Sequence, residues 1–125
     1  MYYNGRENGK LGNLGEDLVA EYLRKCGYII IKRNWRDRFG EIDVIAEKDE
    51  HIIFVEVKTR MDGPMVGGFE AVDRKKAERV QKTALLFLKK LHRPLSPRFD
   101  VAEVTVYKRD DGTTGYNLEY IKSAF

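Results

Sequence analysis

The sequence predicts a single α/β domain in which a mixed β-sheet of about five strands is flanked by helices. Two long segments carry apolar residues at helical spacing, and five shorter segments are rich in β-branched and aromatic residues. One helix falls between the third and fourth strands, so that connection should cross over to a parallel neighbour, while tight turns make the other pairs antiparallel. The predicted order is α-β-β-β-α-β-β, with a helix on each face of the sheet.

The first helix is expected over residues 11–26, because its apolar side chains fill one arc at about 100° per residue. Gly27 follows, where helices commonly end. Residues 1–10 are polar and predict a flexible N-terminal tail, which leaves 11–125 as the domain. The apolar arc consists of Leu11, Leu14, Leu18, Val19, Tyr22, Leu23 and Cys26.

Strands are expected at residues 28–31, 41–46 and 52–59, with turns near 36–40 and 48–51. The third of these is a nearly continuous apolar run, which is typical of a central strand covered on both faces.

In the second half of the chain, residues 61–68 predict a Gly-rich loop and residues 70–91 a helix that ends before Pro94. Two further strands are expected at residues 99–107 and 116–121.

The composition, 42% hydrophobic and 34% charged, is that of a soluble globular protein. No apolar run approaches the roughly 20 residues that span a membrane, and the first residues do not resemble a secretory signal. Cys26 is the only cysteine, so no intrachain disulfide can form. These features predict a cytoplasmic protein.

Basic residues are concentrated in one segment. Arg74 to Arg98 contains nine Lys or Arg and one acid, which gives +8 in a chain whose net charge is +3. This predicts a polyanion partner beside a separate carboxylate-rich site, although a solvated helix face would look the same. The expected nucleic-acid contacts are Lys75, Lys76, Arg79 and Lys82, with Arg36 and Arg60.

Strand alternation places Phe54, Glu56 and Lys58 on one face of the third predicted strand. Glu56 therefore lies at or near the end of a buried strand. A buried carboxylate is costly unless it is paired or binds a metal, so its partner should be Lys58 or a cation.

Asp43, on the preceding predicted strand, is a second carboxylate that needs a partner or a metal. Alternation puts Ile42, Val44 and Ala46 on the face opposite to it. A hairpin would bring Asp43 close to Glu56. Two adjacent carboxylates repel, and a divalent cation between them removes the penalty; oxygen ligands favour Mg²⁺ or Mn²⁺.

A site of this kind suits phosphodiester hydrolysis, with Lys58 stabilising charge on the phosphorane. Alternatively, Glu56 and Lys58 form a plain ion pair and Asp43 caps a turn. His51 and His92 are isolated, which argues against zinc.

A further carboxylate from the first helix could complete the site. Glu16 and Glu21 lie at opposite edges of the apolar arc, and the helical wheel does not choose between them.

The segments GEIDVIA (40–46) and FVEVKTR (54–60) resemble the PD-(D/E)xK nuclease signature, with Glu41-Ile42-Asp43 in place of Pro-Asp. Beyond the first ten residues, nearly the whole chain resembles the YraN-like family of uncharacterised bacterial proteins. The remaining similarity is in residues 12–16, 34–36, 71–72, 76, 98–101 and 121–125.

The resemblance implies a restriction-endonuclease-like three-layer fold similar to that of archaeal Holliday-junction resolvases. It implies that Asp43, Glu56 and Glu16 hold Mg²⁺ or Mn²⁺, that Lys58 is the catalytic lysine and that Lys76 contacts phosphate. By analogy with the two-fold symmetric resolvases it also implies a homodimer.

The predicted function is a metal-dependent endonuclease acting on branched or single-stranded DNA in repair or recombination. One alternative is a non-catalytic nucleic-acid-binding module with the same fold. Another is an RNA-directed nuclease, since tRNA-splicing endonucleases have a similar fold. Those enzymes use a metal-free site centred on histidine, and neither His51 nor His92 is near the carboxylates in sequence.

Overall fold

The computed structural model describes residues 9–61 and 72–125. This part of the chain follows the predicted order of helices and strands, which confirms the α/β class. The elements are α1 (Gly9–Lys25), β1 (Ile29–Arg36), β2 (Glu41–Lys48), β3 (His51–Met61), α2 (Arg74–Leu91), β4 (Ser96–Lys108) and β5 (Thr114–Ile121).

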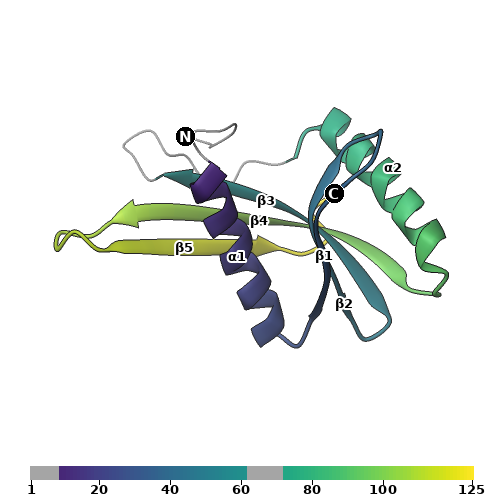
Figure 1. Ribbon diagram of the computed structural model, residues 1–125, viewed down its shortest axis with the longest axis horizontal. Coiled ribbons are helices and arrows are strands. Elements are labelled where there is room, and N and C mark those ends of the chain that lie inside the picture. The colour runs from purple at the N-terminus through teal and green to yellow at the C-terminus, as the bar shows by residue number, and fades with distance from the viewer. Residues whose placement is uncertain (1–8, 62–71) are drawn as a thin grey trace.

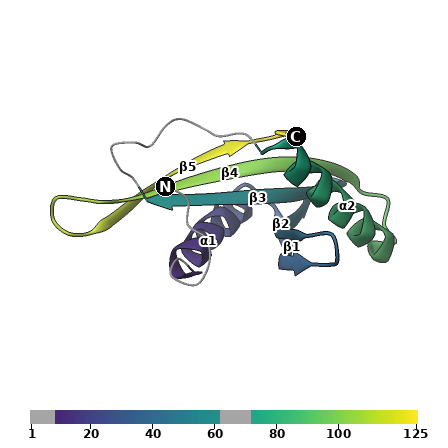
Figure 2. The ribbon, with the colours of Figure 1, turned by 90° about the horizontal axis from the view of Figure 1, so that it is seen from above.

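The strands form one sheet in the order β1-β2-β3-β4-β5 (Figure 1). β3 and β4 are parallel and are joined through α2, whereas the other neighbouring pairs are antiparallel. The sheet is therefore mixed, as predicted. The β4–β5 hairpin extends beyond α1 and the rest of the sheet (Figures 1 and 2).

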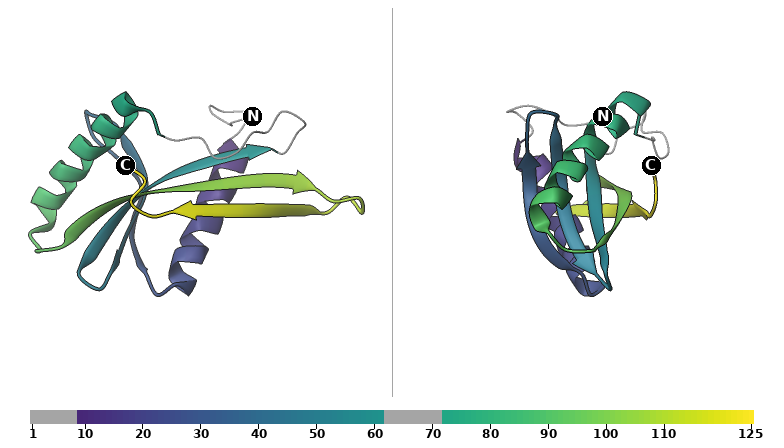
Figure 3. Two further views of the ribbon diagram at one scale, coloured as in Figure 1. Left: turned by 180° about the vertical axis from the view of Figure 1, so that it is seen from behind. Right: turned by 90° about the vertical axis from the view of Figure 1, so that its right-hand side faces the viewer.

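The two helices cover opposite faces of the sheet, which Figure 3 shows from behind and from one side. Leu23 of α1 belongs to one buried cluster together with Val55 of β3. Phe87 of α2 belongs to the other, together with Phe54. Val55 and Phe54 are adjacent on β3, so their side chains point to opposite faces. β3 is thus the central strand that its apolar run predicts.

Two strands begin or end beyond their predicted limits. β1 continues to Arg36, because at the edge of the sheet it can carry exposed charged side chains that hide the apolar pattern. β4 begins at Ser96 and includes Pro97, which has no N–H. Pro97 is tolerated because β5 pairs with β4 only from Val101 onward, so no strand lies on that side to receive its hydrogen bond.

The helix boundaries are close to the predictions. α1 begins at Gly9, two residues early, so the last two residues of the predicted tail at 1–10 are helical; residues 1–8 lie outside the described residues. α2 begins at Arg74 rather than near residue 70, because Asp73 caps it by accepting a hydrogen bond from the Lys76 backbone N–H at 2.9 Å. The predicted loop and helix start within 62–71 lie outside the described residues. Neither helix is long and apolar enough to cross a membrane, within the residues described.

Candidate functional site

Strands β2 and β3 separate at Asp43. Their paired register ends at Val44 opposite Val55, so the next pair would be Asp43 and Glu56. Instead of a backbone carbonyl, Asp43 Oδ2 accepts the hydrogen bond from the Val57 backbone N–H at 2.8 Å. The carboxylate thus satisfies a donor that the sheet would otherwise leave without a partner.

The alternation of β2 also breaks at Asp43. Ile42 packs with Ile45 in the cluster under α2, whereas Val44 packs in the cluster under α1. The prediction that Ile42 and Val44 share a face is therefore wrong. The β1 residue opposite this point is Asn34, whose φ of 53° lies in the left-handed region, so both strands are irregular here.

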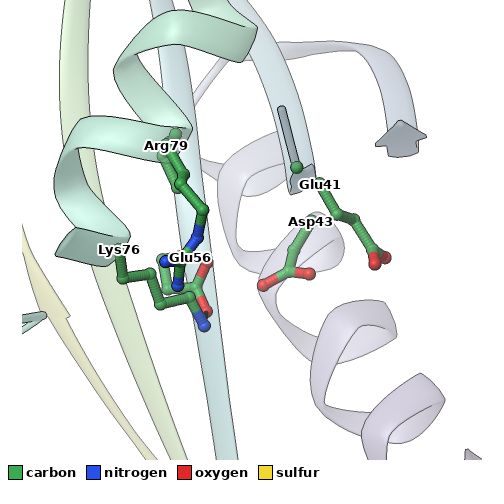
Figure 4. Close-up of a pocket in the computed structure, with 7 residues that line it drawn as sticks. Glu41, Asp43, Glu56, Lys76 and Arg79 are labelled. Carbon is green, nitrogen blue, oxygen red and sulfur yellow. Dashed lines mark ion pairs between the residues drawn. The ribbon is translucent and has the colours of Figure 1, made fainter. Parts of the chain in front are cut away.

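Glu56 is only 5% exposed and forms an ion pair with Lys76 Nζ at 2.5 Å (Figure 4). Lys76 belongs to the first turns of α2 and reaches Glu56 from the neighbouring layer. The sequence suggests Lys58 or a cation as the partner of Glu56, and the structure supplies Lys76. Lys58 follows two residues later on β3, in register with Glu103 of β4.

Glu16, rather than Glu21, is held near the carboxylates. Asn34 Nδ2 donates to Glu16 Oε1 at 3.0 Å, and Arg33 lies 3.5 Å from the same oxygen. Glu21 instead forms a surface ion pair with Lys25, and its side chain is 62% exposed against 13% for Glu16. Arg33 and Asn34 are thus site residues that sequence reasoning missed: Asn34 is notable in the sequence only for the family resemblance, and the contacts of both depend on α1 packing beside β1.

The charges at the site favour a cation. Burial, followed by the nearby charges of Glu56 and then Glu16, raises the pKa of Asp43 well above its ordinary value. Burial also raises the pKa of Glu16, against the lowering effects of Asn34 and Arg33. For Lys76, burial lowers the pKa but the charges of Glu56 and Asp43 outweigh it, so the pKa is raised. The ammonium group of Lys76 occupies a position that favours positive charge.

The carboxylate oxygens suit Mg²⁺ or Mn²⁺ in kind. In their present arrangement, however, no three candidate metal ligands within residues 9–61 and 72–125 form a ready cluster. The Val57 N–H engages Asp43, and Lys76 engages Glu56. A divalent cation would therefore fit this site only if the Lys76 ammonium moved away from Glu56.

A small pocket of about 130 Å³ opens beside these groups (Figure 4). A water molecule occupies about 30 Å³ in the liquid, so the pocket has room for a few waters or one tetrahedral phosphate. The turn at its edge is fixed, because Asp37 Oδ1 accepts hydrogen bonds from the Gly40 N–H and from Thr83 Oγ1 of α2. The pocket is lined by Gly40, Glu41, Asp43, Glu56, Lys76, Arg79 and Val80.

Most of the predicted nucleic-acid contacts lie at the surface. Lys75, Arg79 and Lys82 are exposed on α2, and Arg79 also lines the pocket. The exposed Arg36 lies 3.2 Å from Glu41.

Arg60 differs from the other predicted contacts. Its side chain is 8% exposed and pairs with the buried Glu103. In this arrangement its guanidinium is engaged within the sheet, and a contact of Arg60 with phosphate stays a prediction.

Neither histidine lies at the site. His51 starts β3, five residues or roughly 16 Å along the strand from Glu56. His92 caps the far end of α2, roughly 24 Å along the helix from Lys76.

The fold and site define an α/β protein with a mixed sheet and a carboxylate–lysine site where two of its strands separate. Comparison with known proteins identifies the family. The family model described as "Uncharacterised protein family UPF0102" matches residues 15–104, and this chain belongs to that family. UPF0102 is the YraN-like family, so the resemblance seen in the sequence is confirmed.

Individual relatives agree over nearly their whole length. A UPF0102 protein of Syntrophomonas wolfei is 43% identical over 119 residues, which cover 94% of this chain and 99% of the relative. A UPF0102 protein of Clostridium botulinum (strain Hall) is 38% identical over 120 residues, which cover 94% and 95%.

Proposed function

We propose that this protein is a metal-dependent nuclease that hydrolyses phosphodiester bonds in branched or single-stranded DNA. The observation that carries the proposal is that Asp43 and Glu56 lie close together where β2 and β3 separate. Lys76 of α2 reaches the same point and pairs with Glu56. The raised pKa of Asp43 marks a site that a divalent cation would stabilise.

In this proposal Asp43 and Glu56 hold Mg²⁺ or Mn²⁺, with Glu16 as a further carboxylate. When bound, the cation supplies Lewis-acid polarisation of the phosphate and a more acidic water. Lys58 stabilises negative charge as it develops on the phosphoryl oxygens. Lys76, released from Glu56, and Arg79 orient the phosphate in the pocket. We extend the proposal to a homodimer, which would match the symmetry of a branched substrate.

A second candidate is a non-catalytic nucleic-acid-binding module. One observation favours it: the ion pair between Glu56 and Lys76 compensates the buried carboxylate without a metal.

Lys58→Ala separates the two candidates. If Lys58 acts mainly in the transition state, its loss should reduce cleavage by on the order of a hundredfold or more while nucleic-acid affinity stays within a few-fold. The measurement combines cleavage of branched, single-stranded and duplex DNA under excess Mn²⁺ with melting temperature and affinity. Lys89→Ala, at an exposed position in the last turn of α2, is the matched control.

A lower melting temperature in Lys58→Ala, with no wild-type cleavage of any substrate, would instead support a structural role for Lys58 and the binding-module candidate.

A further inference from the structure

A second pocket lies at the C-terminal end of α1, with a volume of about 320 Å³. That is within the roughly 300–1,000 Å³ range of small-molecule pockets. Leu23, which is fully buried, gives it an apolar base. Its walls include three tyrosines: Tyr22 of α1, Tyr28 just before β1 and Tyr120 of β5.

Two of the tyrosines are fixed through their hydroxyl groups. Tyr120 donates to Asp100 Oδ2 at 2.6 Å, and the Tyr28 hydroxyl accepts from Arg98 Nη2 at 2.9 Å. The rings of Tyr22 and Tyr120 lie 5.2 Å apart. Tyr22 remains 37% exposed, so a flat ligand could stack on it without displacing the other rings.

The charged groups that line this pocket are both cations. Lys48 Nζ donates to the Cys26 carbonyl at 2.6 Å and lies 5.3 Å from the centre of the Tyr28 ring. Lys122, which follows β5, also lines the pocket and is exposed. No carboxylate lines the pocket in the part of the chain that the structure describes. A complementary ligand therefore combines an aromatic ring with an anionic group.

We propose that this pocket binds an unpaired nucleotide of a nucleic-acid strand, with its base stacked on Tyr22 and its phosphate facing Lys48 and Lys122. Aromatic platforms beside a positively charged track are the usual means of holding single strands. The inference rests on the proposed nucleic-acid function and adds a subsite for the unpaired part of the substrate.

The nucleotide pocket is distinct from the carboxylate site. Tyr28 and Tyr120 pack against the cluster under α1, whereas Glu56 meets α2 on the other side of the sheet. Along α1, Tyr22 of the pocket is six residues, roughly 9 Å, from Glu16. Changes in the pocket should therefore leave the cleavage site intact.

Binding measured in EDTA, where cleavage is suppressed, tests the pocket. Tyr22→Ala should weaken binding of a labelled single-stranded oligonucleotide by about tenfold and change binding of a blunt duplex by less than about twofold. Lys122→Glu should cause the same selective loss without removing a packed ring. Tyr116→Ala, on a 50% exposed tyrosine of β5 outside the pocket, is the control and should bind like wild type.

Unchanged single-strand affinity in both pocket variants, with duplex binding retained, would overturn the pocket assignment and leave the proposed function standing. Failure of the wild type to bind either nucleic acid would overturn both. An NMR titration with AMP tests whether the pocket takes a free nucleotide instead of a nucleotide within a strand. If AMP shifts signals in a Tyr22-dependent way while the oligonucleotide does not bind, the proposal of a nucleic-acid strand as the ligand is overturned.

Discussion

Asp43 lies at a position where the protein disfavours a negative charge. Burial and then the charges of Glu56 and Glu16 raise its pKa above the ordinary value of 3.8. An acid with a raised folded-state pKa binds more protons in the folded than in the unfolded protein. Its contribution to stability therefore decreases as pH rises from about 4 through the raised pKa. Once ionised, the group is a cost to the fold that a cation can remove.

Asp43→Asn should therefore raise the melting temperature at pH 8 in EDTA, because the amide carries no charge and can still accept from the Val57 N–H. A gain of about 1 kcal/mol would correspond to about 4 °C in a domain of this size. The difference from wild type should diminish toward pH 4. In Mn²⁺ the wild type should be stabilised and the variant unaffected.

Calorimetric melts from pH 4 to 8, with and without Mn²⁺, measure both effects. Asp110→Asn, in the exposed turn after β4, is the control and should match wild type throughout. Equal Mn²⁺ stabilisation of wild type and Asp43→Asn would remove the metal site from the proposed function.

At the scale of elements, the start of α2 is unusual. Its first turn contains Arg74, Lys75 and Lys76 and no acid, although the helix dipole favours acids there. Glu56 compensates the charge of Lys76, whereas Arg74 and Lys75 oppose the preference of the helix N-terminus for negative charge, as residues at functional sites often do. An anionic ligand at this end of the helix would reverse the penalty, since helix N-termini attract phosphate.

Lys75→Ala, Arg79→Ala and Lys82→Ala should each weaken DNA binding similarly for all sequences. Each should also reduce the slope of log affinity against log salt by about one. Lys89→Ala, roughly 21 Å further along α2 from Lys75, is the control. Affinity that does not change with salt in the wild type would exclude the basic face as a phosphate-binding surface.

α1 depends on close contact with β3 at Gly15. A Cβ atom at this position would lie 1.9 Å from Thr59 Oγ1, so α1 and β3 could not keep their present spacing. The next residue is Glu16, whose place near Asp43 depends on that spacing.

Gly15→Ala should lower stability by about 1–3 kcal/mol, because overpacking outweighs the helix preference for alanine. Chemical denaturation measures the loss, and Asn13→Ala, at an exposed position of α1, is the control. Adding Thr59→Ala removes the closest atom and should recover part of the loss, a coupling that a double-mutant cycle detects. Additive effects of the two changes would show that this contact does not limit the helix position.

At the scale of the whole molecule, Asp100 joins the end of the chain to the sheet. It is fully buried on β4 and accepts hydrogen bonds from Arg98, from the Tyr120 hydroxyl and from the Ser123 backbone N–H. Beyond this point Phe125 packs against Phe99 on the other side of β4. One carboxylate thus connects β4, β5 and the C-terminal residues.

Asp100→Asn should destabilise the protein by about 3–5 kcal/mol, because it leaves Arg98 without its counter-charge among partly buried groups. Urea denaturation followed by tryptophan fluorescence measures the loss, and Asp110→Asn again serves as the exposed control. A loss below about 1 kcal/mol would show that the network fixes the tyrosines without stabilising the fold.

The sequence by itself determined the order of the elements, the two helix faces and the central position of β3. These follow from periods of 3.6 and 2 residues, which are properties of each segment alone. It also placed Glu56 at a buried strand position and Asp43 on the neighbouring strand. The boundaries of β1 and β4 were less predictable, because Pro97 and the charged residues of β1 are acceptable only where a strand edge has no neighbour.

Only the tertiary structure decided which groups meet. It paired Glu56 with Lys76, twenty residues away, and set Glu16 beside Asn34. It also turned Asp43 toward the Val57 N–H, because β2 leaves β3 at an irregularity that strict alternation cannot predict. Such contacts depend on strand register and on the spacing between layers. Both are set by many residues that are far apart in the sequence, so no local sequence pattern predicts them.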